Sequence, residues 1–397
     1  MKIVMIGPFG MRPRTTMKVR ALPLARALVA RGHTVTMLLP PWQNPEDAGL
    51  IWEEESVRIE NMPLPAGIPG WFHGRLAAML VHRARTLKPD VIHTFKPKAY
   101  AGLAHLFLAR SFPIVVDTDD WEGAGGWNDL NPYPATMKHF FAWQEHWGLG
   151  HARAVTVASR ALQTLAWATG GPPERVFYLP NGFAWPFSPV MTAPHIRPTL
   201  LLYTRFFEFD LDRLWRIVQG VRTQRPRARL WVIGKGFFGE EVKLKALAQA
   251  AGWYSAEISS PEDATPDIDL VTYTGWIAPE EQAAHFAQAD VALYPFDDTL
   301  LNRTKCPVKL MDLLAAGMPV VGDAVGQIAQ TIRPEKTGIL IPPEDTTAFI
   351  HNLVALLDNA ERRRALGTNA AQDARARFSW QTLSECAETA YHYAKED

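Results

Sequence analysis

The sequence predicts an α/β protein with two doubly wound, Rossmann-like domains. Short runs rich in valine and isoleucine alternate with helical stretches in both halves of the 397-residue chain, and this length suits two separate cores. The runs are continuously apolar, which is typical of parallel strands covered on both faces. A proline-rich stretch without periodicity, residues 186–198, separates the halves and suits a linker.

The strands of both domains are predicted by apolar runs. In the first half these are KIVMI, TVTMLL, DVIHT, PIVVD, AVTVAS and VFYLP. Between the first two runs, Ala21, Leu24, Ala25 and Leu28 share one helical face, and Gly32 can end that helix. The second half repeats the plan with TLLLYT, ARLWVIG, VTYTG, VALYP, PVVG and GILIP.

The domain boundaries follow from these elements. We place the first domain at residues 1–188, the linker at 189–198 and the second domain at 199–379. Ligands of open α/β sheets bind outside the carboxyl ends of the strands, so we expect a cleft on which both domains face. The last helix, at 380–397, needs a partner surface because it carries one apolar stripe. This stripe comprises Trp380, Leu383, Ala387, Ala390, Tyr391 and Ala394.

Composition and charge exclude several classes of protein. Residues 1–190 hold 19 Lys and Arg against 14 Asp and Glu, and the remainder holds 22 against 27, so the halves carry +5 and −5. This asymmetry is too small for a nucleic-acid partner, but it leaves open a contact with an anionic membrane surface. Cys306 and Cys386 cannot form a disulfide framework, and we find neither a signal peptide nor a membrane-spanning run. We expect a cytoplasmic protein, with peripheral attachment to the inner membrane face as an alternative.

One motif points to a nucleotide cofactor but lies in the wrong place. Residues 234–239 read GKGFFG, the dinucleotide spacing, after an expected strand and with Glu257 about 20 residues further on. The fingerprint normally occupies the first βα turn of a domain, whereas this one lies in the middle of the second domain. The matching turn of the first domain, GPFGMRPRTT, lacks the spacing. We therefore do not expect a nicotinamide cofactor.

The second half contains a specific succession of motifs. LLYTR, WVIGKG, VTYTGW, TKCPVKLMDLLAAGMPVVG and TGILIPPEDTTAFI follow one another over residues 199–380. This order resembles the retaining GT-B glycosyltransferases of family four, the glycosyl transferases group 1, and a weaker similarity extends over the first half. The resemblance implies the GT-B fold, with a C-terminal helix that crosses back to the N-terminal domain. It also implies sugar transfer from a nucleotide sugar to an acceptor hydroxyl, with retention, without a cofactor and without a metal.

The resemblance assigns a donor-binding role to several residues. Asp312 matches the family carboxylate that accepts hydrogen bonds from the ribose hydroxyls. Arg205 offers a forked donor to the leaving diphosphate, and Lys309, one helical turn before Asp312, adds a catalytic positive charge. The other expected donor contacts are Gly10, Gly234, Gly275, Trp276, Lys305, Pro307 and Leu310.

Two departures from the family pattern affect the expected chemistry. Thr304 stands where the family has a first glutamate, and Asp210 stands where it has a lysine. The Thr304 hydroxyl can bind a sugar hydroxyl, but it lacks the charge that stabilises an oxocarbenium-like transition state. These departures favour an alternative in which the protein is a catalytically weak nucleotide-binding scaffold. A second alternative is a nucleotide-sugar epimerase on the same fold.

A group of aspartates follows an expected strand of the first domain. In VVDTDDWEGAGG, Asp117, Asp119 and Asp120 replace the histidine that the family has at this strand end. We predict that Asp119 and Asp120 are catalytic, orienting the acceptor hydroxyl or taking its proton. Two other roles for these aspartates are helix capping and a metal site formed by the three carboxylates. Asp297 and Asp298 in the second domain are the alternative candidates for a carboxylate that takes over from the family glutamate replaced by Thr304.

The acceptor is expected to contact the first domain. His93 and Lys96 follow or end the strand DVIHT, and together with Asp117 they are the predicted acceptor contacts, with a buried core histidine as the alternative for His93. The expected substrates are a UDP- or GDP-linked sugar and an unidentified glycan, lipid or small-molecule acceptor. The stretch at 71–88 mixes aromatic and basic residues, so it either packs on the sheet or rests on a membrane.

Overall fold

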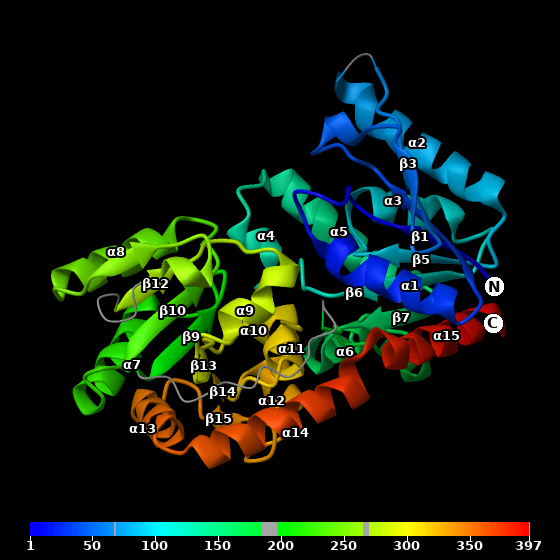
Figure 1. Ribbon diagram of the computed structural model, residues 1–397. Helices are drawn as coiled ribbons and strands as arrows, with labels where there is room; N and C mark the ends of the chain where they lie inside the picture. The colour runs from blue at the N-terminus through cyan, green and yellow to red at the C-terminus, as the bar shows by residue number, and fades with distance from the viewer. Residues whose placement is uncertain (67–68, 184–196, 265–269, 397) are drawn as a thin grey trace. The chain divides into compact units, whose positions relative to one another are not determined.

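The computed structural model forms two compact units (Figure 1). The first unit consists of Met1–Gly182, Thr304–Cys306 and Ser379–Asp397, and the second consists of Phe183–Arg303 and Pro307–Phe378. Most of the predicted linker at 189–198 lies outside the described residues. The structure describes residues 1–66, 69–183, 197–264 and 270–396.

The sheet of the first unit has eight strands in the order β3-β4-β2-β1-β5-β6-β7-β8, and every described pair is parallel except β3 with β4. The six predicted runs form six of these strands. The bounds are β1 Lys2–Ile6, β2 Thr34–Leu39, β3 Ile51–Glu54, β4 Val57–Asn61, β5 Val91–Phe95, β6 Ile114–Thr118, β7 Ala154–Val157 and β8 Val176–Tyr178.

The sheet of the second unit has seven parallel strands in the order β11-β12-β10-β9-β13-β14-β15. The order reverses between β9 and β13, because the chain proceeds from β9 to β10 on one side and from β13 to β14 on the other. Such a reversal is where doubly wound sheets bind ligands. The bounds are β9 Thr199–Tyr203, β10 Arg229–Ile233, β11 Ser255–Glu257, β12 Val271–Tyr273, β13 Val291–Tyr294, β14 Val320–Asp323 and β15 Ile339–Ile341.

The helices connect the strands as parallel sheets require. In the first unit they are α1 Leu22–Ala30, α2 Pro69–Leu87, α3 Ala99–Leu108, α4 Trp127–Leu130, α5 Ala135–His151 and α6 Arg160–Trp167. The next are α7 Leu211–Gln224, α8 Glu240–Ala250, α9 Gln282–Phe286, α10 Leu300–Thr304, α11 Val308–Ala315, α12 Gly326–Thr331, α13 Thr346–Leu357, α14 Ala360–Phe378 and α15 Trp380–Glu396. A π-helix at Met17–Ala21 and 3-10 turns at Pro45–Asp47, Pro173–Arg175, Pro261–Asp263 and Pro279–Glu281 complete the described helical segments. The predicted fold class, with two Rossmann-like domains, is therefore confirmed.

Helix α1 ends as the sequence predicts. Gly32 adopts a φ of +88°, and its N–H donates to Val29 O while the N–H of His33 donates to Leu28 O. These two bonds satisfy carbonyls that the end of a helix leaves without a partner, and a left-handed glycine permits them without steric cost. The four residues predicted to share one face of this helix are all buried.

The C-terminal helix α15 packs on the first unit, beside α1 (Figure 1, red and blue). Its predicted stripe is buried, and the ring of Tyr391 lies in the core of this unit. Glu388 on the same helix forms ion pairs with Arg31 and His33 at the end of α1. The helix therefore completes the hydrophobic core of the first unit.

The sequence analysis missed β3 and β4, an antiparallel pair at the edge of the first sheet. Ile51–Glu54 alternates between more and less exposed residues, and Val57–Asn61 contains charged residues. An edge strand faces solvent on one side, so it lacks the continuous apolar run by which we recognised the central strands.

Candidate active site

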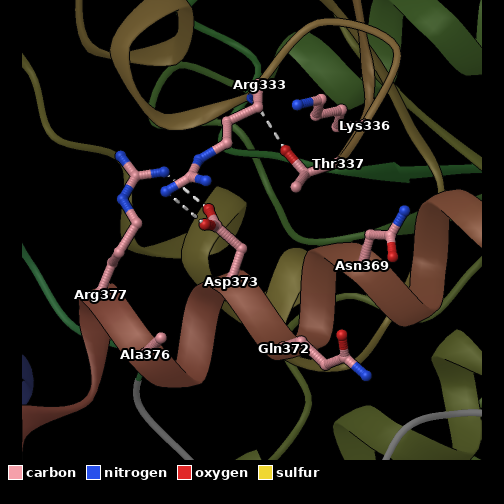
Figure 2. A pocket seen from close by; sticks show the side chains of 8 residues that line it. All are labelled: Arg333, Lys336, Thr337, Asn369, Gln372, Asp373, Ala376 and Arg377. Carbon is pink, nitrogen blue, oxygen red and sulfur yellow. Dashed lines mark hydrogen bonds and ion pairs between the residues drawn. The ribbon is translucent and has the colours of Figure 1, made fainter.

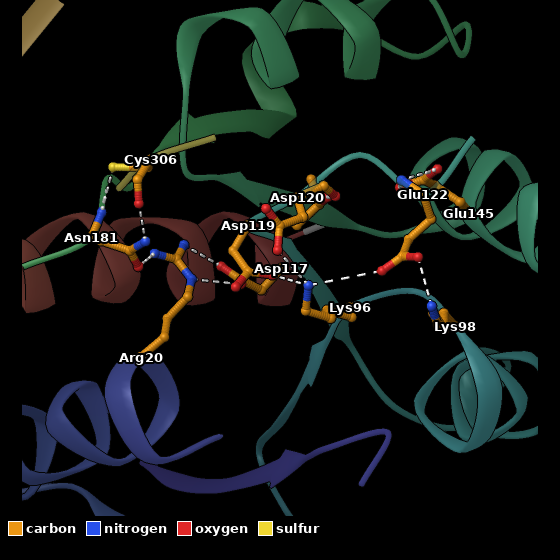
Figure 3. A network of polar contacts seen from close by, with 11 residues as sticks. Arg20, Lys96, Lys98, Asp117, Asp119, Asp120, Glu122, Glu145, Asn181 and Cys306 are labelled. Atoms are coloured by element: carbon orange, nitrogen blue, oxygen red, sulfur yellow. Dashed lines mark hydrogen bonds and ion pairs between the residues drawn. The ribbon is translucent and has the colours of Figure 1, made fainter. Parts of the chain in front are cut away.

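The predicted aspartates of the first unit surround a buried lysine. Lys96 follows β5, and its Nζ lies 3.0 Å from Asp119 Oδ1, 2.9 Å from Asp120 Oδ2 and 3.8 Å from Glu122 Oε1 (Figure 3). Parallel strands β5 and β6 are neighbours, so the residues after their carboxyl ends meet at one edge of the sheet. Residues 119–122, hereafter the acidic loop, thus share one cation.

Two further side chains hold the acidic loop in place. Lys98 Nζ donates to Glu122 Oε2 at 2.6 Å, and the backbone N–H of Glu122 donates to both carboxylate oxygens of Glu145 at 3.1 and 3.2 Å. Burial, together with the charge of Glu122, raises the pKa of Glu145 to about 8. Neither Glu122 nor Glu145 was predicted as a site residue. Glu145 lies within a helix whose sequence indicated only aromatic packing. These contacts fix the conformation of the loop that carries the predicted catalytic pair.

The two aspartates differ in their affinity for a proton. Burial raises the pKa of Asp119 to about 6, with the charge of Lys96 opposing the change and that of Asp120 adding to it. Burial acts in the same direction on Asp120, but the charges of Lys96 and Lys305 outweigh it and lower the pKa. Asp119 therefore has a proton affinity suited to general base catalysis near neutral pH.

Two of the three predicted acceptor contacts lie in the core instead. Asp117 is fully buried and accepts hydrogen bonds from Arg20 Nε at 2.7 Å and Arg20 Nη2 at 2.6 Å. His93 is also fully buried, with Nδ1 at 2.8 Å from the Tyr391 hydroxyl and Nε2 at 3.2 Å from Thr156 Oγ1. Burial lowers the pKa of His93 to about 4, so the ring is neutral. Both side chains therefore support the strand ends in this structure, and for His93 this is the buried core histidine that the sequence analysis named as the alternative.

A short piece of the predicted donor site belongs to the first unit. Ser159 Oγ donates to Thr304 O at 2.6 Å. Figure 3 shows the second bond, in which Asn181 Nδ2 donates to Cys306 O at 2.7 Å. The Lys305 ammonium lies 5.2 Å from the centroid of the Trp127 ring. Thr304 is fully buried in this structure. The charge of Lys305 also lowers the pKa of Asp120, so Lys305 lies near the acidic loop. The sequence analysis had assigned Lys305 to the donor and the acidic loop to the acceptor.

In the second unit, two predicted cations flank a predicted aromatic ring. The Arg205 guanidinium lies 5.7 Å from the centroid of Trp276, and the Lys309 ammonium lies 5.2 Å from the same ring. The Trp276 side chain is 52% exposed, so the group is accessible. Phe237 lies 5.3 Å from Arg205, and Tyr203 lies 5.1 Å from Lys309. We call Tyr203, Phe237 and Trp276 the aromatic cluster; a diphosphate could bind the cations that it holds.

Helix α11 carries Lys309 and Asp312 as predicted, with Pro307 as its N-cap residue and Leu310 in the core. Asp312 is 2% exposed, and its charge adds to the effect of burial in raising the pKa of Tyr203. Asp312 is therefore near enough to the aromatic cluster for its charge to act on Tyr203. Its role toward a ribose remains a prediction.

The predicted glycines have structural reasons for being glycine. Gly234 has a φ of +118°, and a Cβ at this position would lie 2.0 Å from Thr204 O. Its N–H donates to Gly275 O at 2.8 Å, and Gly275 has a φ of +68°. Both residues follow strands at the carboxyl edge of the sheet. At Gly234 the backbone is packed too closely for a side chain, and at Gly275 the left-handed conformation favours glycine. Gly10 follows β1 and is buried against Asn44.

Asp210, a departure from the family pattern, and Asp298, a candidate carboxylate, both have local structural roles. Asp210 is the N-cap of α7 and accepts hydrogen bonds from the N–H groups of Asp212 and Arg213. Asp298 pairs with Arg303 at 2.5 Å, which lowers the pKa of Asp298. Burial raises the pKa of Asp297. Asp298 is therefore committed to a surface ion pair, which makes it the weaker of these two candidates.

An open pocket of about 470 Å³ in the second unit lies elsewhere (Figure 2). Arg333 and Arg377 converge on Asp373 in this pocket, at 2.9 and 2.6 Å. Its loop residues precede β15, at the amino ends of the strands, whereas the predicted donor residues follow strands. None of the predicted site residues lines it. The lining residues are Arg333, Lys336, Thr337, Asn369, Gln372, Asp373, Ala376 and Arg377.

Comparison with known families matches both halves of the chain. A glycosyl transferase 4-like domain matches residues 15–182, and the glycosyl transferases group 1 domain matches residues 197–359. The chain belongs to the group 1 glycosyltransferases. It is an enzyme that transfers a sugar from a nucleotide-sugar donor, and its fold is GT-B, as the sequence resemblance implied.

The relatives carry several donors and acceptors in their names. A GDP-mannose-dependent alpha-(1-6)-phosphatidylinositol monomannoside mannosyltransferase of Mycobacterium tuberculosis is 24% identical over 378 residues, covering 91% of this chain and 90% of the relative. A 2-deoxystreptamine N-acetyl-D-glucosaminyltransferase of Streptomyces fradiae is 24% identical, covering 95% of this chain and 90% of the relative.

Solved structures share the fold at low sequence identity. Sucrose-phosphate synthase of Thermosynechococcus elongatus has a TM-score of 0.70 at 20% identity, with 98% of each chain covered. HepE of Anabaena in complex with UDP-glucose has a TM-score of 0.68 at 17% identity, again with 98% of each chain covered. At these identities the likeness supports the fold alone.

Proposed function

We propose that this glycosyltransferase binds the nucleotide sugar through its second unit and works with retention and without a metal. The observation that carries the proposal is the pair of cations, Arg205 and Lys309, which both lie within 5.7 Å of the ring centroid of an accessible Trp276. A departing nucleoside diphosphate needs positive charge as the glycosidic bond breaks, and these cations supply it from side chains. Asp312 would accept the ribose hydroxyls.

The first unit would serve the acceptor side through the acidic loop. Asp119 has a raised pKa of about 6, so it is largely ionised at neutral pH yet basic enough to take a proton from an acceptor hydroxyl. Asp120 stays charged and helps to hold Lys96. In a front-face reaction the leaving phosphate oxygen takes the acceptor proton itself, and Asp119 would then orient the hydroxyl.

We further propose a UDP- or GDP-linked sugar as the donor and a lipid-linked acceptor, with the enzyme peripheral to the inner face of a membrane. The mycobacterial relative, whose name makes it GDP-mannose-dependent and specific for a phosphatidylinositol mannoside, supports a GDP-linked donor and a lipid acceptor. No described helix combines the length and the apolar character that are needed to cross a bilayer.

A donor screen followed by product analysis tests the function. Thermal shift with UDP-, GDP-, ADP- and dTDP-sugars identifies the donor, because a ligand at 100 times its dissociation constant stabilises by about 2.7 kcal/mol. Transfer is then assayed with EDTA present, and NMR determines the anomeric configuration of the product. We expect retention and no loss of rate with EDTA. Inversion or a requirement for metal would overturn the mechanism.

The same assay separates the alternatives. A nucleotide-sugar epimerase converts the donor without an acceptor, and a scaffold binds nucleotide without transfer or donor hydrolysis. Asp210 is explained as a helix cap, which removes part of the sequence argument for a scaffold.

A further inference from the structure

The pocket of the second unit that Figure 2 shows is built from one helix face and one loop. Helix α14 contributes side chains at the i, i+3, i+4, i+7 and i+8 positions, which share one face of a helix. They are Asn369, Gln372, Asp373, Ala376 and Arg377. The loop before β15 contributes Arg333, Lys336 and Thr337. We call the pocket that these eight residues line the basic pocket.

Hydrogen bonds hold the loop of the basic pocket in a tight turn. The N–H groups of Lys336 and Thr337 both donate to Arg333 O, at 3.0 and 2.9 Å. In return, the N–H of Arg333 donates to Thr337 Oγ1 at 2.8 Å, and the Thr337 side chain is buried. A bridge between Pro334 and Gly338 closes the turn. The backbone that carries Arg333 and Lys336 is therefore held in place by the protein itself.

One carboxylate orients two arginines in the basic pocket. Asp373 Oδ1 lies 2.9 Å from Arg333 Nη2, and Oδ2 lies 2.6 Å from Arg377 Nη1. Figure 2 shows both guanidinium groups turned toward this carboxylate. The side chain of Asp373 is 13% exposed, whereas that of Arg333 is 56% exposed, so the cation is the more accessible partner. A guanidinium has five N–H donors, so one carboxylate does not exhaust those of Arg333.

The basic pocket differs in sign from the half of the chain that carries it. Its lining has three cations, Arg333, Lys336 and Arg377, against the carboxylate of Asp373, which gives a net charge of +2. Glu335, the carboxylate of the same loop, forms an ion pair with Arg362 at 2.5 Å. Residues 191–397 as a whole hold 22 Lys and Arg against 27 Asp and Glu, a net charge of −5. A cationic hollow raises the local concentration of anions.

We propose that the basic pocket binds a small phosphomonoester that also carries hydroxyl groups, as a sugar phosphate does. The forked donors of arginine match the oxygens of a phosphate, and the ammonium of Lys336 adds a point charge. Further along α14, the amides of Asn369 and Gln372 can donate to hydroxyl groups and accept from them. The volume of about 470 Å³ suits a small molecule. Among the described lining residues Ala376 alone is apolar, so the ligand is hydrophilic.

The basic pocket is separate from the proposed donor site. Its loop precedes β15, whereas Arg205 and Trp276 come after β9 and β12. These strands belong to one parallel sheet, so the two sets of residues lie at opposite edges of it. Both sites can therefore be occupied together, and the inference does not depend on the proposed donor contacts.

Isothermal calorimetry on the full chain tests the proposal, with mannose 6-phosphate, inorganic phosphate and mannose as probes. We expect mannose 6-phosphate to bind, inorganic phosphate to bind more weakly, and mannose not to bind. The double variant Arg333→Gln/Lys336→Gln should bind mannose 6-phosphate at least about tenfold more weakly, because hydrogen bonds to charged groups are lost. The matched control Arg216→Gln/Arg364→Gln removes the same charge from exposed positions of the second unit outside the pocket. It should bind as wild type does.

Two companion measurements separate the basic pocket from the fold and from the donor site. Circular dichroism and nucleotide-sugar binding should be unchanged in the double variant, and Arg205→Ala should keep its affinity for mannose 6-phosphate. Wild-type protein that binds neither phosphate compound would overturn the proposal, as would a double variant that binds like its control. Loss of binding in Arg205→Ala would place the phosphate in the donor site instead. Equal affinity for mannose 6-phosphate and inorganic phosphate would overturn the role given to the amides.

Discussion

In the first unit, the charged residues that follow β6 in the sequence form ion pairs inside the protein. In the second unit, the cations that follow β9 and lie on α11 contact aromatic rings instead. Lys96 is surrounded by three carboxylates of the acidic loop. Arg205 and Lys309 instead lie 5.7 and 5.2 Å from the ring centroid of Trp276, whose ring face attracts cations without neutralising them.

This difference indicates how the charged groups of each region can interact with a ligand. An aromatic ring orients a cation and leaves its full charge for an incoming phosphate. A buried ion-pair network fixes its own geometry and changes the proton affinities of its members. The predictions below test this contrast, from the largest expected effect to the smallest.

Breaking the buried network should cost most. Lys96→Met leaves the carboxylates of the acidic loop without their cation, and removing one partner of a buried ion pair costs about 3–5 kcal/mol. Urea unfolding measures the loss. The control Arg225→Met removes an exposed pair with Asp358 and should leave the free energy of unfolding nearly unchanged. Equal losses in the two variants would mean that the acidic loop gains no stability from Lys96.

The cations of the aromatic cluster should affect catalysis more than stability. Arg205→Ala and Lys309→Ala should each lower kcat by about 10²–10³, the effect of removing one transition-state donor. The affinity for a nucleoside without phosphates should change little. Arg216→Ala, an exposed cation on α7, is the control. An equal loss of affinity for nucleoside and nucleoside diphosphate would place these cations away from the diphosphate.

Asp312 tests whether the second unit also recognises the ribose. Asp312→Ala should weaken nucleoside binding by about 1.5–3 kcal/mol, the range for a hydrogen bond to a charged group. Isothermal calorimetry measures it, with Asp212→Ala, which removes an exposed pair with Lys243, as the control. Unchanged affinity in a folded Asp312→Ala protein would rule out the ribose contact.

Asp119 should set the acid limb of the pH–rate profile. Its pKa is raised to about 6, so the transfer rate should fall as the pH drops through this value and the carboxylate gains a proton. Asp119→Asn should be slower and should lack this limb. A variant profile that keeps the limb would assign it to another group.

Glu388 lies outside the acidic loop and tests the comparison further, because its pKa is lowered whereas that of Asp119 is raised. The hydrogen bond from Arg31 is the main cause, and it lowers the pKa of Glu388 from 4.5 to about 2. Glu388 therefore stabilises the fold above pH 4.5, and this contribution is lost as the pH falls toward 2. Glu388→Gln should cost about 1 kcal/mol at pH 7 and nearly nothing at low pH. A constant difference between the urea midpoints of the two proteins across this range would contradict the assignment.

Most of the fold could be predicted from the sequence, because central parallel strands are continuous apolar runs. Two of the strands that were missed, β3 and β11, lie at sheet edges, where one side faces solvent, and the third, β4, has its apolar run interrupted by charged residues. The helix stripe of α15 and the glycine end of α1 were also predicted correctly, since both depend on residues close together in the chain.

The candidate site was predicted less completely. Arg205, Lys309 and Trp276 do come together, because each follows a strand or begins a helix at one edge of the sheet. The buried hydrogen bonds of His93 and Asp117 involve Tyr391 and Arg20, which are remote in sequence, so no local pattern showed these partners. The same holds for Glu145, which supports the acidic loop from the middle of α5.

The assignment of residues 304–306 and 379–397 to the first unit has a consequence for how the protein is made. The ribosome completes Gly182 roughly 200 residues before it reaches α15. At about 5–20 residues per second, the first unit waits roughly 10–40 s for its last helix. During that interval the core surface that α15 covers, including His93, lies open. The half of the enzyme that is synthesised first therefore finishes folding last, and a nascent-chain chaperone has its longest opportunity there.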